Sequence, residues 1–138
     1  TATEATHQAR RLLEEVGLEA SDAEKYPDGF SGGQRQRIVI ARALAVEPEF
    51  LVLDESVAAL DAQIQRDVLA LLDLIGRERK LTYLFISHDL DVVASFCNRL
   101  IILEKGRIME AGATEDILRQ PATEYTTELL ASRPKNLR

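Results

Sequence analysis

The chain has 138 residues, of which 46% are apolar and 29% are charged, and its formal net charge is -6. This is the composition of one ordinary globular domain, and the acidic balance argues against a nucleic acid or an anionic membrane surface as the main partner. A single cysteine, Cys97, allows no internal disulfide. No apolar run approaches the ~18 residues of a membrane-spanning helix, and the first residues are too polar for a signal peptide. We therefore expect a cytoplasmic protein.

The beginning of the chain has no initiator methionine and runs directly into a helical pattern. Leu12, Leu13 and Val16 lie at helical spacing, and Gly17 is a good stop for that helix. We expect this sequence to be a piece of a longer protein.

A glycine-rich turn, Ser31-Gly32-Gly33-Gln34, precedes a helical pattern that continues to Val46. The first N–H groups of a helix have no partner inside it, and two glycines let a ligand approach closely. Such a turn suits phosphate oxygens. The alternative is a glycine-rich helix start that Ser31 simply caps.

The apolar run Phe50 to Leu53 predicts a strand buried on both faces of a parallel sheet. Asp54 and Glu55 follow at its carboxyl end, where open α/β sheets bind ligands. Mg²⁺ prefers oxygen ligands and keeps several waters, so one carboxylate can serve a metal while the next handles a water molecule. The alternative is an acidic turn after a strand.

Two further polar residues stand at element ends. Asp61 is a good N-cap for a helix whose apolar stripe runs from Ile64 to Ile75. The segment Leu81 to Ser87 predicts a second buried strand, with His88 at its carboxyl end. A histidine in this place can be functional or can simply pack and hydrogen-bond as part of the structure.

The last third of the chain predicts a third strand, a hairpin and two helices. The strand covers Leu100 to Leu103, and Lys105-Gly106 makes a tight turn into an antiparallel partner. Thr114 has the form of an N-cap, and a last helix is expected over Glu124 to Ala131. The order of strands and helices predicts an α/β fold, with a parallel sheet flanked by helices and a short antiparallel hairpin near the C-terminal end.

Taken together, four segments resemble the ATP-binding domain of ABC transporters: Phe30 to Arg37, Leu51 to Glu55, Ala59 to Asp61 and Ile86 to Asp89. The signature motif of that family is most specific in its Ser-Gly-Gly-Gln core, and this chain matches all four positions. The resemblance implies part of a P-loop-NTPase-type sheet. It divides the chain into the end of a helical subdomain with the signature helix (1–46), the C-terminal part of the ATPase core (47–112) and C-terminal helices (113–138).

The resemblance implies catalytic and metal-binding roles for three residues. Asp54 is similar to the aspartate that holds Mg²⁺, directly or through water, and Glu55 to the carboxylate that orients the attacking water. His88 resembles the histidine that reaches the γ-phosphate of ATP, where a donor stabilises charge in the transition state.

The resemblance also implies a second ATPase subunit, bound head to tail. Ser31, Gly32, Gly33 and Gln34 would contact the γ-phosphate of an ATP held mainly by that subunit. Asp61 would belong to the D-loop, which joins the two ATP sites across the dimer.

Three stretches look most like the ATPases of dipeptide, oligopeptide and nickel importers: Tyr26-Pro27, Gln34 to Ile38 and Thr123 to Leu130. This implies coupling of ATP hydrolysis to import of a peptide or of nickel. The subunit would dock on membrane-spanning permease subunits at the cytoplasmic face of the cell membrane, with no role for nucleic acid.

The sequence departs from the family pattern in one major way, since it contains no Gly-x-x-x-x-Gly-Lys-Ser/Thr phosphate loop. We therefore expect the C-terminal part of an ATPase domain that does not hydrolyse ATP alone. A milder departure is Ser56, where a proline is common. Two alternatives stay open: a head of a DNA-repair, chromosome-maintenance or ribosome-associated ABC protein, or a non-catalytic module that only contributes a signature surface.

Overall fold

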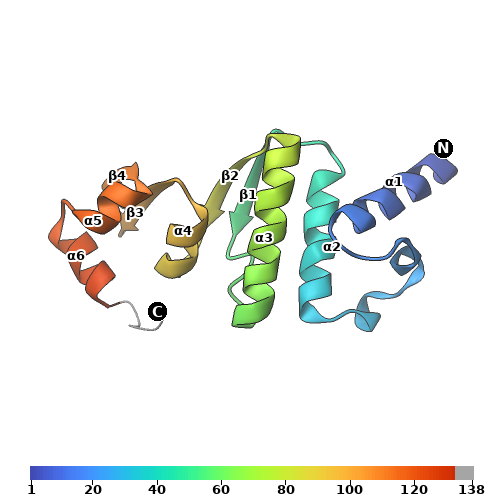
Figure 1. Ribbon diagram of the computed structural model, residues 1–138, viewed down its shortest axis with the longest axis horizontal. Coiled ribbons are helices and arrows are strands. Elements are labelled where there is room, and N and C mark those ends of the chain that lie inside the picture. The colour runs from blue at the N-terminus through green and yellow to red at the C-terminus, as the bar shows by residue number, and fades with distance from the viewer. Residues whose placement is uncertain (133–138) are drawn as a thin grey trace. The chain divides into compact units, whose positions relative to one another are not determined.

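The computed structural model describes residues 1–132, and it divides into two compact units, residues 1–84 and residues 85 onward (Figure 1). The end of the predicted C-terminal region, residues 133–138, lies outside the described residues. Among residues 1–132, no helix is both long and apolar enough to cross a membrane. The predicted three-part division at residues 46 and 112 stays a prediction.

Three helices form the body of the first unit. Helix α2 lies between α1 and α3, and short 3₁₀ turns connect α1 to α2 (Figure 1). Fully buried apolar side chains from these helices and their ends form the core, because each amphipathic helix turns its apolar stripe inward. The elements are α1 (Ala2–Glu15), 3₁₀ turns at Ala20–Glu24 and Pro27–Gly29, α2 (Gly32–Leu44) and α3 (Ala62–Arg79), and the buried residues include Val16, Ile40, Leu44, Val68, Leu72 and Ile75.

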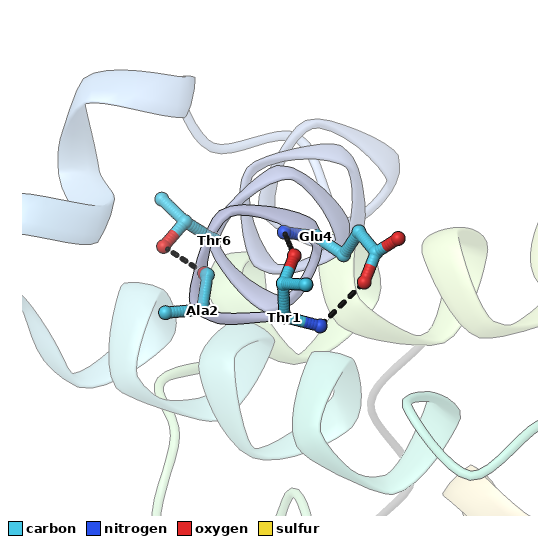
Figure 2. Close-up of polar contacts among 4 residues, drawn as sticks. All are labelled: Thr1, Ala2, Glu4 and Thr6. Atoms are coloured by element: carbon cyan, nitrogen blue, oxygen red, sulfur yellow. Dashed lines mark hydrogen bonds and ion pairs between the residues drawn. The ribbon is translucent and has the colours of Figure 1, made fainter.

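The first turn of α1 is closed by its own side chains (Figure 2). The Thr1 hydroxyl accepts a hydrogen bond from the Glu4 backbone N–H at 3.4 Å, and the Thr1 amino group pairs with the Glu4 carboxylate. The Thr6 hydroxyl donates to the Ala2 carbonyl at 2.9 Å. The Thr1 hydroxyl thereby satisfies the Glu4 N–H, one of the N–H groups that a helix leaves unpaired at its start.

Strands β1 (Phe50–Asp54) and β2 (Thr82–Ile86) pair in parallel, as expected of strands joined by a helical crossover. Helix α3 packs against this pair: the Tyr83 hydroxyl donates to the Leu72 carbonyl at 2.8 Å, and the Tyr83 ring lies against Gly76. Burial raises the pKa of Tyr83 to about 12, so the phenol stays protonated at neutral pH.

The expectation that Phe50 to Leu53 is buried on both faces is wrong for the described chain. Leu53 is 6% exposed, whereas Phe50 and Val52 are 54% and 51% exposed and Leu84 on β2 is 43% exposed. Alternate residues of a strand point to opposite faces, and α3 covers only one of them. Nothing in the described part of the first unit covers the other face.

Up to residue 132, the second unit consists of an antiparallel hairpin with three helices. Strands β3 and β4 pair from Arg99 with Ala113 to Glu104 with Arg107, and Lys105 and Gly106 make the predicted tight turn with left-handed φ angles of 48° and 77°. Leu100, Ile102 and Ile117 form its buried centre. The elements are α4 (Leu90–Phe96), β3 (Arg99–Glu104), β4 (Arg107–Ala113), α5 (Thr114–Arg119) and α6 (Glu124–Ala131), the last with the predicted bounds.

The predicted N-cap at Thr114 is wrong. Ala113 precedes α5, and Thr114 is its first residue, only 5% exposed. Its hydroxyl donates to the Cys97 carbonyl at 2.5 Å and its N–H to the Asn98 carbonyl at 2.9 Å. Thr114 therefore anchors the start of α5 to the segment before β3 instead of capping the helix.

The exposed apolar face of β1 and β2 leads us to expect self-association of the 138-residue chain, because such surfaces and sheet edges pair readily. Replacing Val52 and Leu84 by threonine puts a residue of high β-propensity at both positions but removes apolar surface, and should raise the monomer fraction in sedimentation velocity. Val46→Thr is the matched control, since Val46 is 80% exposed but lies outside the sheet. A chain that is already monomeric at all concentrations would contradict this expectation.

Candidate functional site

The signature turn, Ser31–Gln34, begins α2 through a reciprocal capping box. The Ser31 hydroxyl accepts from the Gln34 N–H at 3.2 Å, and the Gln34 side-chain oxygen accepts from the Ser31 N–H at 2.9 Å. The alternative of a capped, glycine-rich helix start is therefore observed. This cap leaves phosphate binding possible, because the N–H groups of Gly32 and Gly33 still have no acceptor within the helix.

Two arginines of α2 hold this turn in place. Arg35 donates to the Phe30 carbonyl at 2.9 Å, and Arg37 donates to the Val16 carbonyl at the C-terminal end of α1 at 2.6 Å. A Cβ added at Gly17 would lie only 2.6 Å from Nη1 of Arg37, so a side chain at residue 17 would clash with this guanidinium. Sequence patterns do not predict this contact of Arg37, because its partner is a backbone carbonyl 21 residues away.

The two glycines of the signature turn have different surroundings. Gly32 is exposed, and a Cβ added there would meet no atom within 4 Å. Gly33 is buried against α3, and a Cβ there would lie 2.7 Å from Cγ2 of Ile64. The sequence predicted room for a ligand at both glycines, whereas in this chain the room at Gly33 is filled by a side chain.

The acidic pair at the end of β1 is open to solvent. Asp54 is the last residue of the strand, and both Asp54 and Glu55 are exposed. Glu55 has a left-handed backbone with φ of 47°. For a residue other than glycine, this conformation costs on the order of 1–3 kcal/mol and occurs preferentially at functional sites.

A tight turn carries the chain from Glu55 to Asp61. Backbone hydrogen bonds of 3.2 Å join Ala58 N–H to the Glu55 carbonyl and Leu60 N–H to the Val57 carbonyl, and Val57 is 1% exposed. Buried Val57 therefore anchors the backbone of the turn that follows Glu55.

Asp61 caps α3 as predicted. Its Oδ1 accepts from the N–H groups of Gln63 and Ile64, each at 3.0 Å. Because the Ile64 side chain in turn contacts Gly33, the structure brings Asp61 and the signature turn together through one residue. The sequence had assigned Ile64 only to an apolar stripe.

His88 belongs to the second unit and is exposed, in the segment between β2 and α4. The following residue, Asp89, caps α4 by accepting from the N–H groups of Asp91 at 3.0 Å and Val92 at 3.2 Å. The first unit thus holds seven of the eight predicted site residues, and the position of His88 relative to them is not determined.

A cavity and an ion pair of the first unit lie away from the predicted site residues. A cavity of about 750 Å³ lies among α1 and the C-terminal ends of α2 and α3, beside the ion pair of Arg79 with Glu15, whose N–O distance is 2.5 Å. None of the predicted site residues lines it. In residues 1–132, no group of three or more His, Cys, Asp or Glu side chains could hold a metal.

Comparison with known proteins gives the same family as the motifs. Residues 2–58 match the family model described as ABC transporter. The chain is 47% identical over 123 residues to the oligopeptide transport ATP-binding protein OppF of Mycoplasma pneumoniae, covering 89% of this chain and 14% of that protein. It is 44% identical over 131 residues to the uncharacterized ABC transporter ATP-binding protein YejF of Escherichia coli, covering 95% of this chain and 25% of that one.

A solved structure has the same fold. The ADP conformation of MJ1267, an ATP-binding cassette of an ABC transporter, superimposes with a TM-score of 0.77 at 26% identity, covering 92% of this chain and half of that chain. The fold is thus the α/β fold of ABC ATPase domains, as predicted. The chain belongs to the ABC transporter ATP-binding proteins, and it spans a quarter or less of the length of the two relatives named above.

The cap at Asp61 gives a direct test of how the turn from Glu55 to Asp61 is held at its end. Asp61→Ala should lower the free energy of unfolding by about 1 kcal/mol, because two N–H groups lose their acceptor. Asp61→Asn should be much milder, since asparagine also caps helices. Urea unfolding of dilute protein measures both, and equal stability of the alanine variant and the unchanged chain would show that the cap contributes nothing.

Proposed function

We propose that this chain is part of the ATP-hydrolysing subunit of a peptide importer. The observation that carries the proposal is the acidic pair at the end of β1: Asp54 and Glu55 are both exposed, and Glu55 is held in a left-handed backbone. Two adjacent carboxylates at this place can divide the work of binding a metal and directing a water molecule. The printed name of the Mycoplasma relative, an oligopeptide transport ATP-binding protein, supports peptide over nickel as the cargo.

The residues present fit a magnesium ion that arrives with ATP. Mg²⁺ usually takes one or two protein carboxylates, and its other ligands are phosphate oxygens and water. An exposed aspartate at the end of a strand is sufficient for such a site, because the ion does not need three protein ligands. Asp54 would hold the ion, and a bound Mg²⁺ would neutralise charge on the phosphate oxygens.

Glu55 is the residue we assign to the attacking water. Its carboxylate can accept a hydrogen bond from that water and so orient it toward the γ-phosphate. The buried Val57 and the two turn hydrogen bonds hold the backbone that carries this side chain, which favours a reproducible starting position for the carboxylate.

The other predicted residues complete a two-subunit site in this proposal. The N–H groups of Gly32 and Gly33, with Ser31 and Gln34, would face the γ-phosphate of an ATP bound mainly by a second subunit. Asp61 would lie at the contact between the two sites. His88 would donate a hydrogen bond to the γ-phosphate, where donors stabilise the transition state.

The subunit would act at the cytoplasmic face of the membrane, bound to permease subunits. The names of the two relatives contain "transport" or "transporter", which favours a transport subunit over the head of a DNA-repair or ribosome-associated protein.

The direct experiment uses the full-length protein that contains this chain, assembled with its membrane subunits. Glu55→Gln keeps the size of the side chain but removes its charge, and should lower the kcat of ATP hydrolysis by ~100-fold or more. Glu49→Gln is the matched control, because Glu49 is an exposed residue of the same segment and should leave kcat unchanged. Equal activity of the Glu55→Gln variant and the unchanged protein would overturn the assignment.

The 138-residue chain by itself should neither bind Mg-ATP with micromolar affinity nor hydrolyse it. It has no phosphate loop, and that loop's lysine and backbone N–H groups supply most of the contacts to the β- and γ-phosphates in such enzymes. Calorimetry with Mg-ATP tests this, and micromolar binding by the isolated chain would contradict it.

A further inference from the structure

We propose that Ile64 is a positioning residue that sets the signature turn and the D-loop turn at a fixed distance within one subunit. The proposal rests on the proposed function, since the two turns matter to ATP hydrolysis only if they face nucleotide. It assigns the missing side chain of Gly33 to helix packing rather than to ligand approach.

The contact itself is close and specific. A Cβ on Gly33 would lie 2.7 Å from Cγ2, 3.6 Å from Cδ1 and 3.8 Å from Cβ of Ile64. Van der Waals contact between carbon atoms is optimal near 3.5–4.0 Å, so only glycine lets α2 approach α3 this closely. Gly32, one residue earlier, has no atom within 4 Å of its own Cβ position. The two glycines are therefore present for different reasons.

Ile64 is connected to both turns. Its side chain contacts Gly33, and its backbone N–H donates to Oδ1 of Asp61 at 3.0 Å. On the other side, the capping box of Ser31 with Gln34 fixes the first turn of α2. A change in the volume of either contacting residue must therefore shift the signature turn relative to Asp61.

Such a shift would change catalysis more than binding. In the proposed two-subunit site, the signature turn acts on an ATP that the other subunit holds. Displacing it should lower kcat while the KM for ATP hardly changes, because a misplacement of about 1 Å can slow a reaction by ~100-fold.

The test is a double-mutant cycle in the full-length protein with its membrane subunits. Gly33→Ala is made in three backgrounds, the unchanged protein, Ile64→Ala and Ile64→Val, and each background is also measured with glycine at position 33. Alanine at position 64 removes Cγ2, the atom at 2.7 Å, whereas valine keeps both branches at Cβ and loses only Cδ1. Valine is therefore the matched control for the steric contact. We would measure kcat and KM well below the melting temperature, and the melting temperature separately.

The expected result is a dependence of the Gly33→Ala effect on residue 64. With isoleucine or valine there, Gly33→Ala should lower kcat by ~10-fold or more at nearly constant KM, and with alanine it should change kcat by less than ~3-fold. The melting temperature should follow the same pattern, because the same clash strains the packing of α2 on α3.

Three outcomes would overturn the proposal. Gly33→Ala may lower kcat equally in all three backgrounds, which would assign the glycine to ligand approach. A change in melting temperature alone, with kcat unaffected, would make the contact merely structural. Full rescue by valine would show that Cγ2 is not the obstacle. If the unchanged protein hydrolysed no ATP, the proposed function would fail and Ile64 would have no role in ATP hydrolysis. The melting temperatures of the same variants would still show whether Gly33 and Ile64 are in contact.

Discussion

The position of α2 between α1 and α3 is the constraint on which the rest of the first unit depends. Ile40 and Leu44 bury one side of this helix, and Arg37 ties it to the carbonyl at the end of α1. Gly33 lets its first turn approach α3. Since the signature turn is the start of this helix, the packing of α2 decides where Ser31 and Gly32 point.

A second constraint concerns the turn after β1. The strand delivers Asp54 to the edge of the sheet, and the left-handed backbone at Glu55 then redirects the chain within one residue. Buried Val57 and the cap at Asp61 fix the rest of the turn before α3 begins. The local strain at Glu55 is offset by this surrounding structure, which holds the backbone of the turn that carries the acidic pair.

Local features of the sequence were sufficient to predict many of the boundaries of the helices and strands. Ser31 before two glycines, Asp61 before an apolar stripe, and Lys105-Gly106 between two apolar segments each predicted an element boundary that the structure has. These boundaries are set by backbone groups and side chains within three or four residues of one another. The same holds for α6, which begins after Thr123 and ends at Ala131.

What the sequence did not predict depends on contacts between distant segments. The apolar run at Phe50 is compatible with burial on both faces, but which elements cover each face depends on the rest of the protein. Thr114 looked like a cap because its partner, the Cys97 carbonyl, is 17 residues away. The contact of Gly33 with Ile64 joins residues of two helices, and no local pattern distinguishes a glycine needed for packing from one needed by a ligand.

The central claim is that one subunit supplies the acidic pair and its partner supplies the signature turn to the same nucleotide. A structure of the full-length protein with its membrane subunits and a non-hydrolysable Mg-ATP analogue tests it most directly. We expect Asp54 and Glu55 of one subunit near the metal and γ-phosphate, with the partner subunit's Ser31 on the same phosphate. A nucleotide contacted by Ser31 and Glu55 of one and the same subunit, or one bound away from both, would contradict it.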